Sequence, residues 1–345
     1  MPVAQKAELI DFTSALLAAA GYTPHEAAQT ADLLVWANLR GADSHGVLRV
    51  PRYVEMIETG VVRPGQQPKA VREFGATCVF DYGKAPGAVA MQHAAGKAGE
   101  LAQAFGIGWC GARAISHAGA IGYFTAHLAR RGLIGIVMTA SRPLMSYFGA
   151  KGEALSTNPL SIAVPQADGT DPIVLDMSTA AVALGKIMAA KDTGNPIPLG
   201  WAIDANGAET SDPHAVAAIL PMAGPKGSGL SLMIEILSSL LVGNAVIAPF
   251  LSGEAKGGFN GLALAIDPAA FGDKAAFLLA VEDLAAAIHK LDPVAGADGV
   301  RLPGERGFET ERARLANGIP LANGTAKNLK EAAMRLGLAV PAFLN

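Results

Sequence analysis

Cysteine and charged residues are both scarce in this chain, and each shortage excludes a class of protein. Cys78 and Cys110 are the two cysteines in 345 residues, and neither lies in a C-x-x-C pair or at metal-ligand spacing. A disulfide framework or a zinc site therefore does not follow, and we expect two reduced, buried thiols and no bound metal. Charged residues make up 17% and the net charge is −3, without the basic excess of a nucleic-acid-binding protein.

Long hydrophobic runs are also few. The most apolar one, 230–251, contains Glu235 and is broken near its end by Pro249. These residues favour a buried helix over a membrane-spanning segment. Lys6 and Glu8 near the first residue do not fit a signal peptide. We therefore expect a cytoplasmic protein without a membrane partner.

Hydrophobic residues make up 51% of the chain, enough for about two domains of typical size. The pattern predicts helices through the first sixty residues and again from Glu309, around a central body that contains a sheet. The predicted strands are 76–82, 107–114, 133–140, 160–164, 173–176 and 261–267, and the predicted central helices are 86–105, 121–131, 178–191 and 273–290. The fold class is therefore mixed α/β.

A match to the dinucleotide motif G-x-G-x-x-G spans Gly106–Gly111. The true motif follows a strand and opens a helix, whereas this one follows a predicted helix and opens a predicted strand. We interpret it as a helix stop followed by a strand with small side chains.

A stronger anion site is predicted at "GPKGSG". Gly224, Gly227 and Gly229 allow close approach of the backbone to a ligand, and Lys226 adds a cation. A long helix starts directly afterwards, so its free N–H groups favour a phosphate or carboxylate. The alternative is a loop with a solvated lysine. A second candidate is 176–178, where a strand ends and a helix is predicted to begin, with a simple helix cap as the alternative.

Two histidines lie in contexts that suit acid–base chemistry. Ser44 is predicted to cap a helix ending at Gly60, which would place His45, Arg49 and Tyr53 on one helical face. A guanidinium binds a carboxylate with two hydrogen bonds, and an imidazole one turn away can exchange a proton with a group next to that carboxylate. A structural histidine in a capped turn is the alternative.

The second histidine, His117, follows a predicted strand and precedes a helix, with Ser116 as a possible cap. The small residues 118–120 leave room beside it for a ligand.

Several blocks of sequence, taken in order, resemble one enzyme family. The blocks are "GADSHGVLRVPRY", "SHAGAIGYFTAHLARRGLIGI", "STNPLSIAVP", "LDMSTAAVALGK", "GWAIDANG", "LPMAGPKGSGLSLMIEILSSLLVG" and "VRLPGE". Together they look like the malate/L-lactate dehydrogenase-type oxidoreductases, which include sulfolactate, ureidoglycolate and diketogulonate enzymes and cyclic-imine reductases. That family is distinct from the Rossmann-type lactate and malate dehydrogenases.

The resemblance implies the family's own non-Rossmann α/β fold. A helical domain would combine residues 1–75 with 306–345, and residues 76–305 would form the central nicotinamide-cofactor-binding domain. It also implies a homodimer, or a larger oligomer built from dimers, with an active site shared between subunits.

The resemblance further implies roles for individual residues. His45, or His117 as in some members, would be the general acid/base, with Ser44 beside it, and Arg49 would hold the substrate carboxylate next to Tyr53. The substrate pocket would include Ser141, Thr157 and Asn158. The cofactor, NAD or NADP, would contact Asp176, Met177, Ser178, Pro225, Lys226, Gly227, Gly304 and Glu305.

The expected reaction is reversible hydride transfer between a nicotinamide and C2 of a small 2-hydroxy or 2-oxo acid. One alternative is reduction of a cyclic imino acid such as pyrroline- or piperideine-2-carboxylate. Another is a protein that binds an organic anion without catalysis. "HAGAIGYF" and "GPKG" are closest to the ureidoglycolate branch of the family, and this likeness favours NAD. Two features depart from the family pattern: Ser156 stands where a glycine is common, and residues 142–148 follow no branch. These departures leave the identity of the substrate open.

Overall fold

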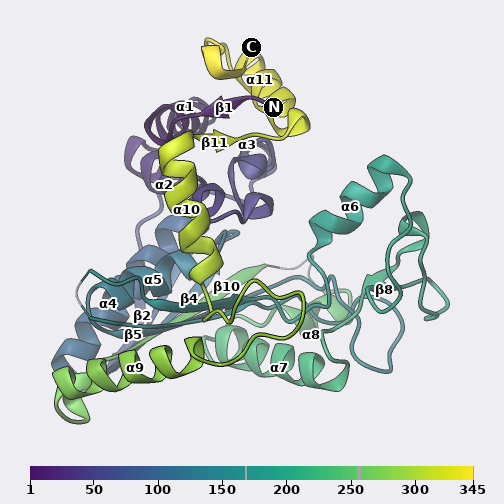
Figure 1. The fold of residues 1–345 in the computed structure, drawn as a ribbon. Coiled ribbons are helices and arrows are strands. Elements are labelled where there is room, and N and C mark those ends of the chain that lie inside the picture. Colours follow the sequence, from purple (N-terminus) through teal and green to yellow (C-terminus); the bar gives the residue numbers. More distant parts are fainter. Residues whose placement is uncertain (168, 255–257, 345) are drawn as a thin grey trace.

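The computed structural model describes residues 1–167, 169–254 and 258–344, and its centre is a seven-stranded mixed sheet (Figure 1). β3 and β4 pair in parallel, and the other neighbouring strands pair antiparallel. In sheet order the strands are β2 (Lys69–Phe74), β3 (Thr77–Ala85), β4 (Ile107–Ile115), β10 (Phe259–Ile266), β5 (Ile134–Ser141), β6 (Leu160–Val164) and β7 (Ile173–Met177).

Helices cover both faces of this sheet. The longer helices are α1 (Lys6–Ala19), α2 (Pro24–Leu39), α3 (Val50–Glu58), α4 (Gly87–Phe105), α5 (Gly122–Arg130), α6 (Leu184–Thr193), α7 (Pro225–Glu235), α9 (Lys274–His289), α10 (Glu305–Asn317) and α11 (Asn323–Arg335). In Figure 1, α4 and α5 lie above the sheet, and α7 and α9 lie below it. Successive residues of a strand face opposite sides, and β10 shows this directly. The Asn260 side chain bonds to Ser239 just after α7, whereas Gly261 lies against Met91 of α4.

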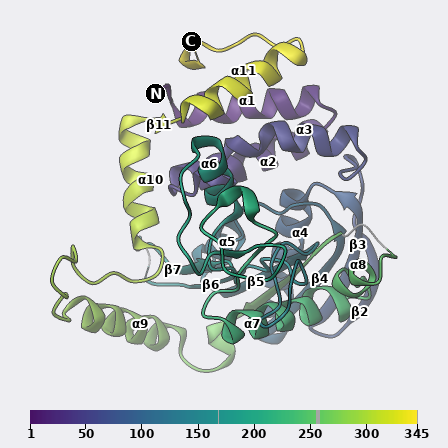
Figure 2. The same ribbon diagram turned by 90° about the vertical axis from the view of Figure 1, so that its right-hand side faces the viewer.

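The two ends of the chain lie together at the top of the molecule (Figure 2). β1 (Val3–Ala4) pairs with β11 (Ile319–Pro320), and helices α1, α2, α3, α10 and α11 gather around them. β2 lies inside the range 1–75 yet pairs with β3 in the main sheet. The division into two domains at the predicted boundaries stays a prediction.

A further part of the chain projects from the sheet and carries α6, β8 (Ala202–Ile203) and β9 (Ala218–Ile219) (Figure 1). It has a small core of its own, formed by Met145, Leu155, Ala180, Val182, Ile187, Ile197, Ala202 and Ile219. The helix predicted from residue 178 begins only at Leu184, so that prediction was wrong at its start. The Ser178 hydroxyl donates to the Thr157 carbonyl and accepts from the Ala180 N–H, which holds a turn in place of a helix.

The apolar run 230–251 was predicted to be a buried helix, and this was wrong in part. It forms most of α7, a π-helical turn (Ile236–Leu240) and α8 (Ile247–Leu251), but Leu240 and Leu241 are 49% and 60% exposed. No helix among the described residues is long and apolar enough to cross a membrane.

Two local predictions are confirmed. Gly106 ends α4, and Gly108 lies in β4 where a Cβ would overlap the Ala98 carbonyl oxygen, so these glycines serve helix–sheet packing. Cys78 and Cys110 are buried free thiols, opposite each other on β3 and β4.

Candidate active site

The segment that links α2 to α3 is not the continuous helix predicted from Ser44. It forms two 3₁₀ turns, Asp43–His45 and Val47–Arg49, and α3 starts at Val50. The cause is Asn38, whose amide donates to Asp43 and accepts from the Val47 N–H. The backbone bends around this buried side chain, so His45 and Arg49 lie on turns rather than on one helical face.

The fold brings the two predicted histidines together. The rings of His45 and His117 are nearly parallel, 20° apart, with centroids separated by 6.0 Å. Nδ1 of His45 lies 3.1 Å from the Ser44 hydroxyl, and Nδ1 of His117 lies 2.8 Å from the Tyr53 hydroxyl. In the described part of the chain neither Nε2 has a partner, and neither is among the buried unpaired atoms. Both Nε2 atoms are therefore accessible to a ligand.

Arg49 completes this group. Its Nε donates to the Ser44 carbonyl oxygen at 2.7 Å, which fixes the guanidinium beside the 3₁₀ turn that carries His45. The hydrogen bonds and ion pairs of the described residues leave both Nη groups unpaired. A planar guanidinium with two free Nη groups can hold a carboxylate with two parallel hydrogen bonds.

Both imidazoles are held neutral at ordinary pH. Burial, and then the positive charge of Arg49, lowers the pKa of His45 to about 4. Burial lowers the pKa of His117 to about 3, with further contributions from His45 and Arg49. A bound carboxylate would offset the Arg49 charge and so raise both values.

The C-terminal end of β5 meets the same group of side chains. The Phe259 ring packs edge-on against His117, with centroids 6.3 Å apart, and Phe259 pairs directly with Ser141. Side chains of directly paired residues lie on one face of a sheet, so Ser141 lies on the His117 face. Its hydroxyl bonds to that of Ser156 at 2.6 Å. No sequence motif singled out Phe259.

Two residues predicted to line the substrate pocket are instead held by hydrogen bonds within the protein. Asn158 is fully buried, and its amide donates to the Ser231 carbonyl on α7, so the structure does not bring it to an accessible surface. Thr157 is half-buried, and its carbonyl oxygen accepts from Thr179 and Ser178.

The predicted cofactor residues gather along one edge strand, β7. Asp176 accepts a hydrogen bond of 2.9 Å from Gly122, the first residue of α5 and five residues after His117. Protein packed around this carboxyl group raises its pKa to about 6, although the side chain still reaches solvent. At the end of the strand the Thr179 carbonyl accepts from Met222. The stretch from Val174 to Thr179 spans about 17 Å of extended chain.

The glycine–lysine loop joins this strip at its far end. Pro225 and Lys226 are exposed in the first turn of α7, and Gly227 packs so closely that a Cβ would overlap the Met222 carbonyl oxygen. The first turn of α7 therefore starts beside the end of β7. The free N–H groups predicted there are not found: Pro225 has none, and those of Lys226, Gly227 and Ser228 donate to the carbonyl oxygens of Ala223, Met222 and Gly224. The exposed ammonium group of Lys226 is left as the group of this turn that can bind a phosphate. No contact among the described residues joins Lys226 directly to either histidine.

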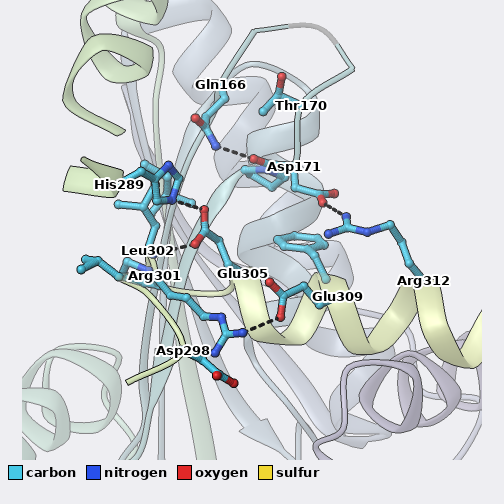
Figure 3. A pocket seen from close by; sticks show the side chains of 15 residues that line it. Gln166, Thr170, Asp171, His289, Asp298, Arg301, Leu302, Glu305, Glu309 and Arg312 are labelled. Carbon is cyan, nitrogen blue, oxygen red and sulfur yellow. Dashed lines mark hydrogen bonds and ion pairs between the residues drawn. The ribbon is translucent and has the colours of Figure 1, made fainter. Parts of the chain in front are cut away.

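The turn at 303–305 borders the other end of β7. The Pro303 carbonyl accepts from the Val174 N–H, and Arg40 donates to the Gly304 carbonyl at 3.0 Å. Glu305 is occupied within the protein: it pairs with His289 at 2.7 Å and accepts from the Leu302 N–H (Figure 3). A cavity of about 430 Å³ lies beside this turn, bordered also by the Arg312–Asp171 pair. The cavity does not include the two histidines.

Known proteins match this chain over most of its length. Ureidoglycolate dehydrogenase (NAD(+)) of Escherichia coli O157:H7 is 34% identical, with 89% of each chain covered. (2R)-3-sulfolactate dehydrogenase (NADP(+)) of Chromohalobacter salexigens is 35% identical, over 87% of this chain and 89% of the relative. A crystal structure of malate dehydrogenase from Entamoeba histolytica superposes with a TM-score of 0.91 at 27% identity, covering 98% and 99% of the two chains.

The fold class is therefore the mixed α/β fold of this malate dehydrogenase structure. The names of the two sequence relatives specify NAD for one and NADP for the other. Because these dehydrogenases match most of the chain, they argue against the alternative of a protein that binds an organic anion without catalysis. The family model for malate/L-lactate dehydrogenases matches residues 4–330. This chain belongs to the malate/L-lactate dehydrogenase family and is an NAD(P)-dependent 2-hydroxyacid dehydrogenase.

Proposed function

We propose that Arg49 holds the carboxylate of a small 2-hydroxy acid, or of the matching 2-oxo acid, with its C2 oxygen beside His45 and His117. One observation carries this proposal: two unpaired Nη groups lie next to two imidazoles whose Nε2 atoms are accessible. Ser44 orients His45 from its Nδ1 side. Ser141 and Phe259 border the other side of the substrate.

In this account the residues of the chain carry the proton and fix the orientation. The substrate carboxylate offsets the Arg49 charge, and this raises the pKa of the neighbouring imidazoles from their low values in the free enzyme. An imidazole can then accept the hydroxyl proton as the C2 hydrogen leaves as hydride. The bound nicotinamide supplies the hydride acceptor in oxidation and the hydride donor in reduction.

We assign the cofactor to the strip along β7. Asp176, Met177 and Ser178 border its middle, and Gly304 borders the other end. Lys226 binds the pyrophosphate with its ammonium group, and Pro225 and the buried Gly227 set the shape of the turn that carries it. Because Glu305 is bonded to His289 and Leu302, we assign it to holding the turn. NAD is the proposed preference, on the likeness of "HAGAIGYF" to the ureidoglycolate branch. Lys226→Ala should weaken cofactor binding, measured by the fluorescence of bound NADH.

We also propose a homodimer in which a second copy covers the lower layer of the molecule. The exposed apolar side chains support this: Leu240 and Leu241 follow α7, and Leu279 and Leu284 on α9 are 61% and 59% exposed. α7 and α9 lie on the same side of the sheet (Figure 1). Monomers rarely leave apolar patches of this kind uncovered. A site shared between the subunits is part of this proposal.

A spectrophotometric screen at 340 nm tests the reaction. Malate, lactate, sulfolactate and ureidoglycolate are supplied with NAD or NADP, and the 2-oxo acids with the reduced cofactors. Pyrroline- and piperideine-2-carboxylate test the imine alternative in ammonia-free buffer. Turnover of a 2-hydroxy acid that exceeds imine reduction supports the proposal. Turnover of the imines alone would assign the site to the alternative.

A further inference from the structure

The two catalytic imidazoles have different hydrogen-bonding environments at Nδ1. The geometry points to Tyr53 and the Gly119 amide as the groups that fix the proton of neutral His117 on Nε2. This inference rests on the proposed function. His117 then donates a hydrogen bond to the C2 oxygen of the substrate, and His45 takes the proton. Tyr53 is thus a positioning residue that acts through His117.

Two hydrogen-bond donors converge on Nδ1 of His117. The Tyr53 hydroxyl lies 2.8 Å away, and the backbone nitrogen of Gly119 lies 3.3 Å away. A backbone N–H donates a hydrogen bond and cannot accept one. A proton on Nδ1 would therefore point at the Gly119 N–H hydrogen and be repelled by it. The neutral ring therefore accepts at Nδ1 and carries its proton on Nε2, as tautomers are assigned from their partners.

Tyr53 is suited to act as a permanent donor. It is 4% exposed, and burial raises the pKa of its phenol, so the hydroxyl keeps its proton. His117 Nδ1 is its hydrogen-bond partner among the described residues. The Phe259 edge packs against His117 as well. The charged and titratable groups that act on His117 are His45 and Arg49, and both oppose an imidazolium at this position.

The hydrogen-bond partner of His45 allows its proton to lie on either ring nitrogen. Its Nδ1 faces the Ser44 hydroxyl at 3.1 Å, and a hydroxyl can either donate or accept. Ser44 and His45 are both half-buried, as His117 is, and the first turn of α6 lies beside them, where a Cβ on Gly185 would be 3.8 Å from that of Ser44. His45 can therefore carry its proton on Nδ1 and present an unprotonated Nε2 to the substrate.

The division of roles balances the reaction. In oxidation the O–H bond breaks and its proton goes to Nε2 of His45, the C2–H bond breaks and its hydride goes to the oxidised nicotinamide, and the C=O bond forms. His117 keeps its proton throughout and stabilises the negative charge on the oxygen with a hydrogen bond. In reduction the protonated His45 returns the proton.

Nitrogen NMR of the free enzyme, labelled with ¹⁵N in the histidine rings, tests the tautomer without relying on any substrate. His117→Gln assigns the His117 signals. The expected result is a protonated Nε2 and an unprotonated Nδ1 in His117. A proton on Nδ1 would overturn the inference, even if the protein oxidised 2-hydroxy acids efficiently.

Glutamine variants test the roles, because the glutamine amide can donate where Nε2 lies but cannot accept a proton. His117→Gln should keep a measurable part of kcat, about 10²-fold below wild type, a loss typical of a weakened donor. His45→Gln should lose about 10⁴-fold. The reverse order would contradict the assignment.

Tyr53→Phe and Tyr82→Phe form a matched pair. Tyr82 makes the same kind of bond to Nδ1 of His93, 2.9 Å long, in the core between β3 and α4. Tyr53→Phe should lower kcat about 10-fold and leave NADH binding unchanged. In its NMR spectrum the His117 signals should shift toward a mixture of the two tautomers. Tyr82→Phe should leave kcat and the His117 signals unchanged. An unaltered His117 spectrum in Tyr53→Phe would overturn the role of Tyr53.

Discussion

At the scale of single residues, the function depends on whether Arg49 holds the substrate carboxylate. Its Nε is bonded to the Ser44 carbonyl, and its Nη groups remain unpaired among the described residues. Arg49→Ala should lower kcat/KM about 10²-fold or more, because the substrate loses both its ionic partner and its orientation. Arg49→Lys should recover little, since an ammonium cannot form the two parallel hydrogen bonds.

Steady-state kinetics with the best substrate from the screen measures this effect. Arg52→Ala is the matched control, because Arg52 lies three residues along the chain and pairs with Glu55 on the surface. The control should retain wild-type kcat/KM. Equal losses in both variants would mean that Arg49 has no specific role.

The low pKa values of the histidines predict a pH profile. The imidazole must be neutral to accept a proton, and the pKa of His45 is about 4 in the free enzyme rather than the ordinary value near 6.5. Since kcat/KM reports free-enzyme ionisations, oxidation at saturating cofactor should keep its plateau down to about pH 5. A decline centred near pH 6.5 would show that neither burial nor Arg49 depresses the pKa of the essential base.

The residues of the candidate site could be found from the sequence, but their contacts could not. Motifs singled out His45, His117 and Arg49 because an imidazole or a guanidinium stands there next to small glycine and serine residues, which leave room for a ligand. The stack of the two rings depends on Asn38, which bends the chain into turns that a helical pattern does not predict. Phe259 joins the site through strand pairing over a long sequence separation, which no local motif encodes.

At the scale of elements, the first turn of α7 is the feature that positions the predicted pyrophosphate site. Gly227→Ala would place a methyl group against the Met222 carbonyl and the Thr179 carbonyl, and so push the helix start away from β7. We expect the Kd for NADH to rise about 10-fold while kcat at saturating cofactor changes little. Fluorescence titration and steady-state kinetics measure the two quantities.

Gly96→Ala supplies the control, because Gly96 lies inside α4 and a Cβ there would meet open space. It removes a glycine from a helix interior and should not weaken NADH binding. If Gly227→Ala binds NADH as tightly as Gly96→Ala does, the cofactor does not depend on this turn.

Among the elements, long periodic segments were predictable and short ones were not. β4, β5, α5 and α9 follow the predicted ranges closely, because each has a clear apolar period and a glycine or aspartate at its boundary. β2 was missed because all six of its residues are exposed, so it has no alternating pattern. The start of α6 was missed because the Ser178 side chain stabilises a turn instead.

At the scale of the whole molecule, the apolar lower layer predicts self-association. Leu240→Asp with Leu241→Asp would place two charges in the proposed interface, where they cannot be solvated. Sedimentation velocity should show a dimer for the wild type and a monomer for this double variant, with loss of turnover if the site is shared. Met334→Asp is the control on α11, where Met334 is 65% exposed. A wild-type monomer with full activity would contradict the proposed dimer.

Transfer of the C2 hydrogen is the most direct test of the central claim. The best 2-hydroxy acid from the screen, labelled with deuterium at C2, is incubated with the oxidised cofactor and the enzyme, and the reduced cofactor is analysed by mass spectrometry. The account predicts one deuterium in the reduced cofactor, formed by wild type and lost with His45→Gln. Product formation without deuterium in the cofactor would contradict hydride transfer from C2.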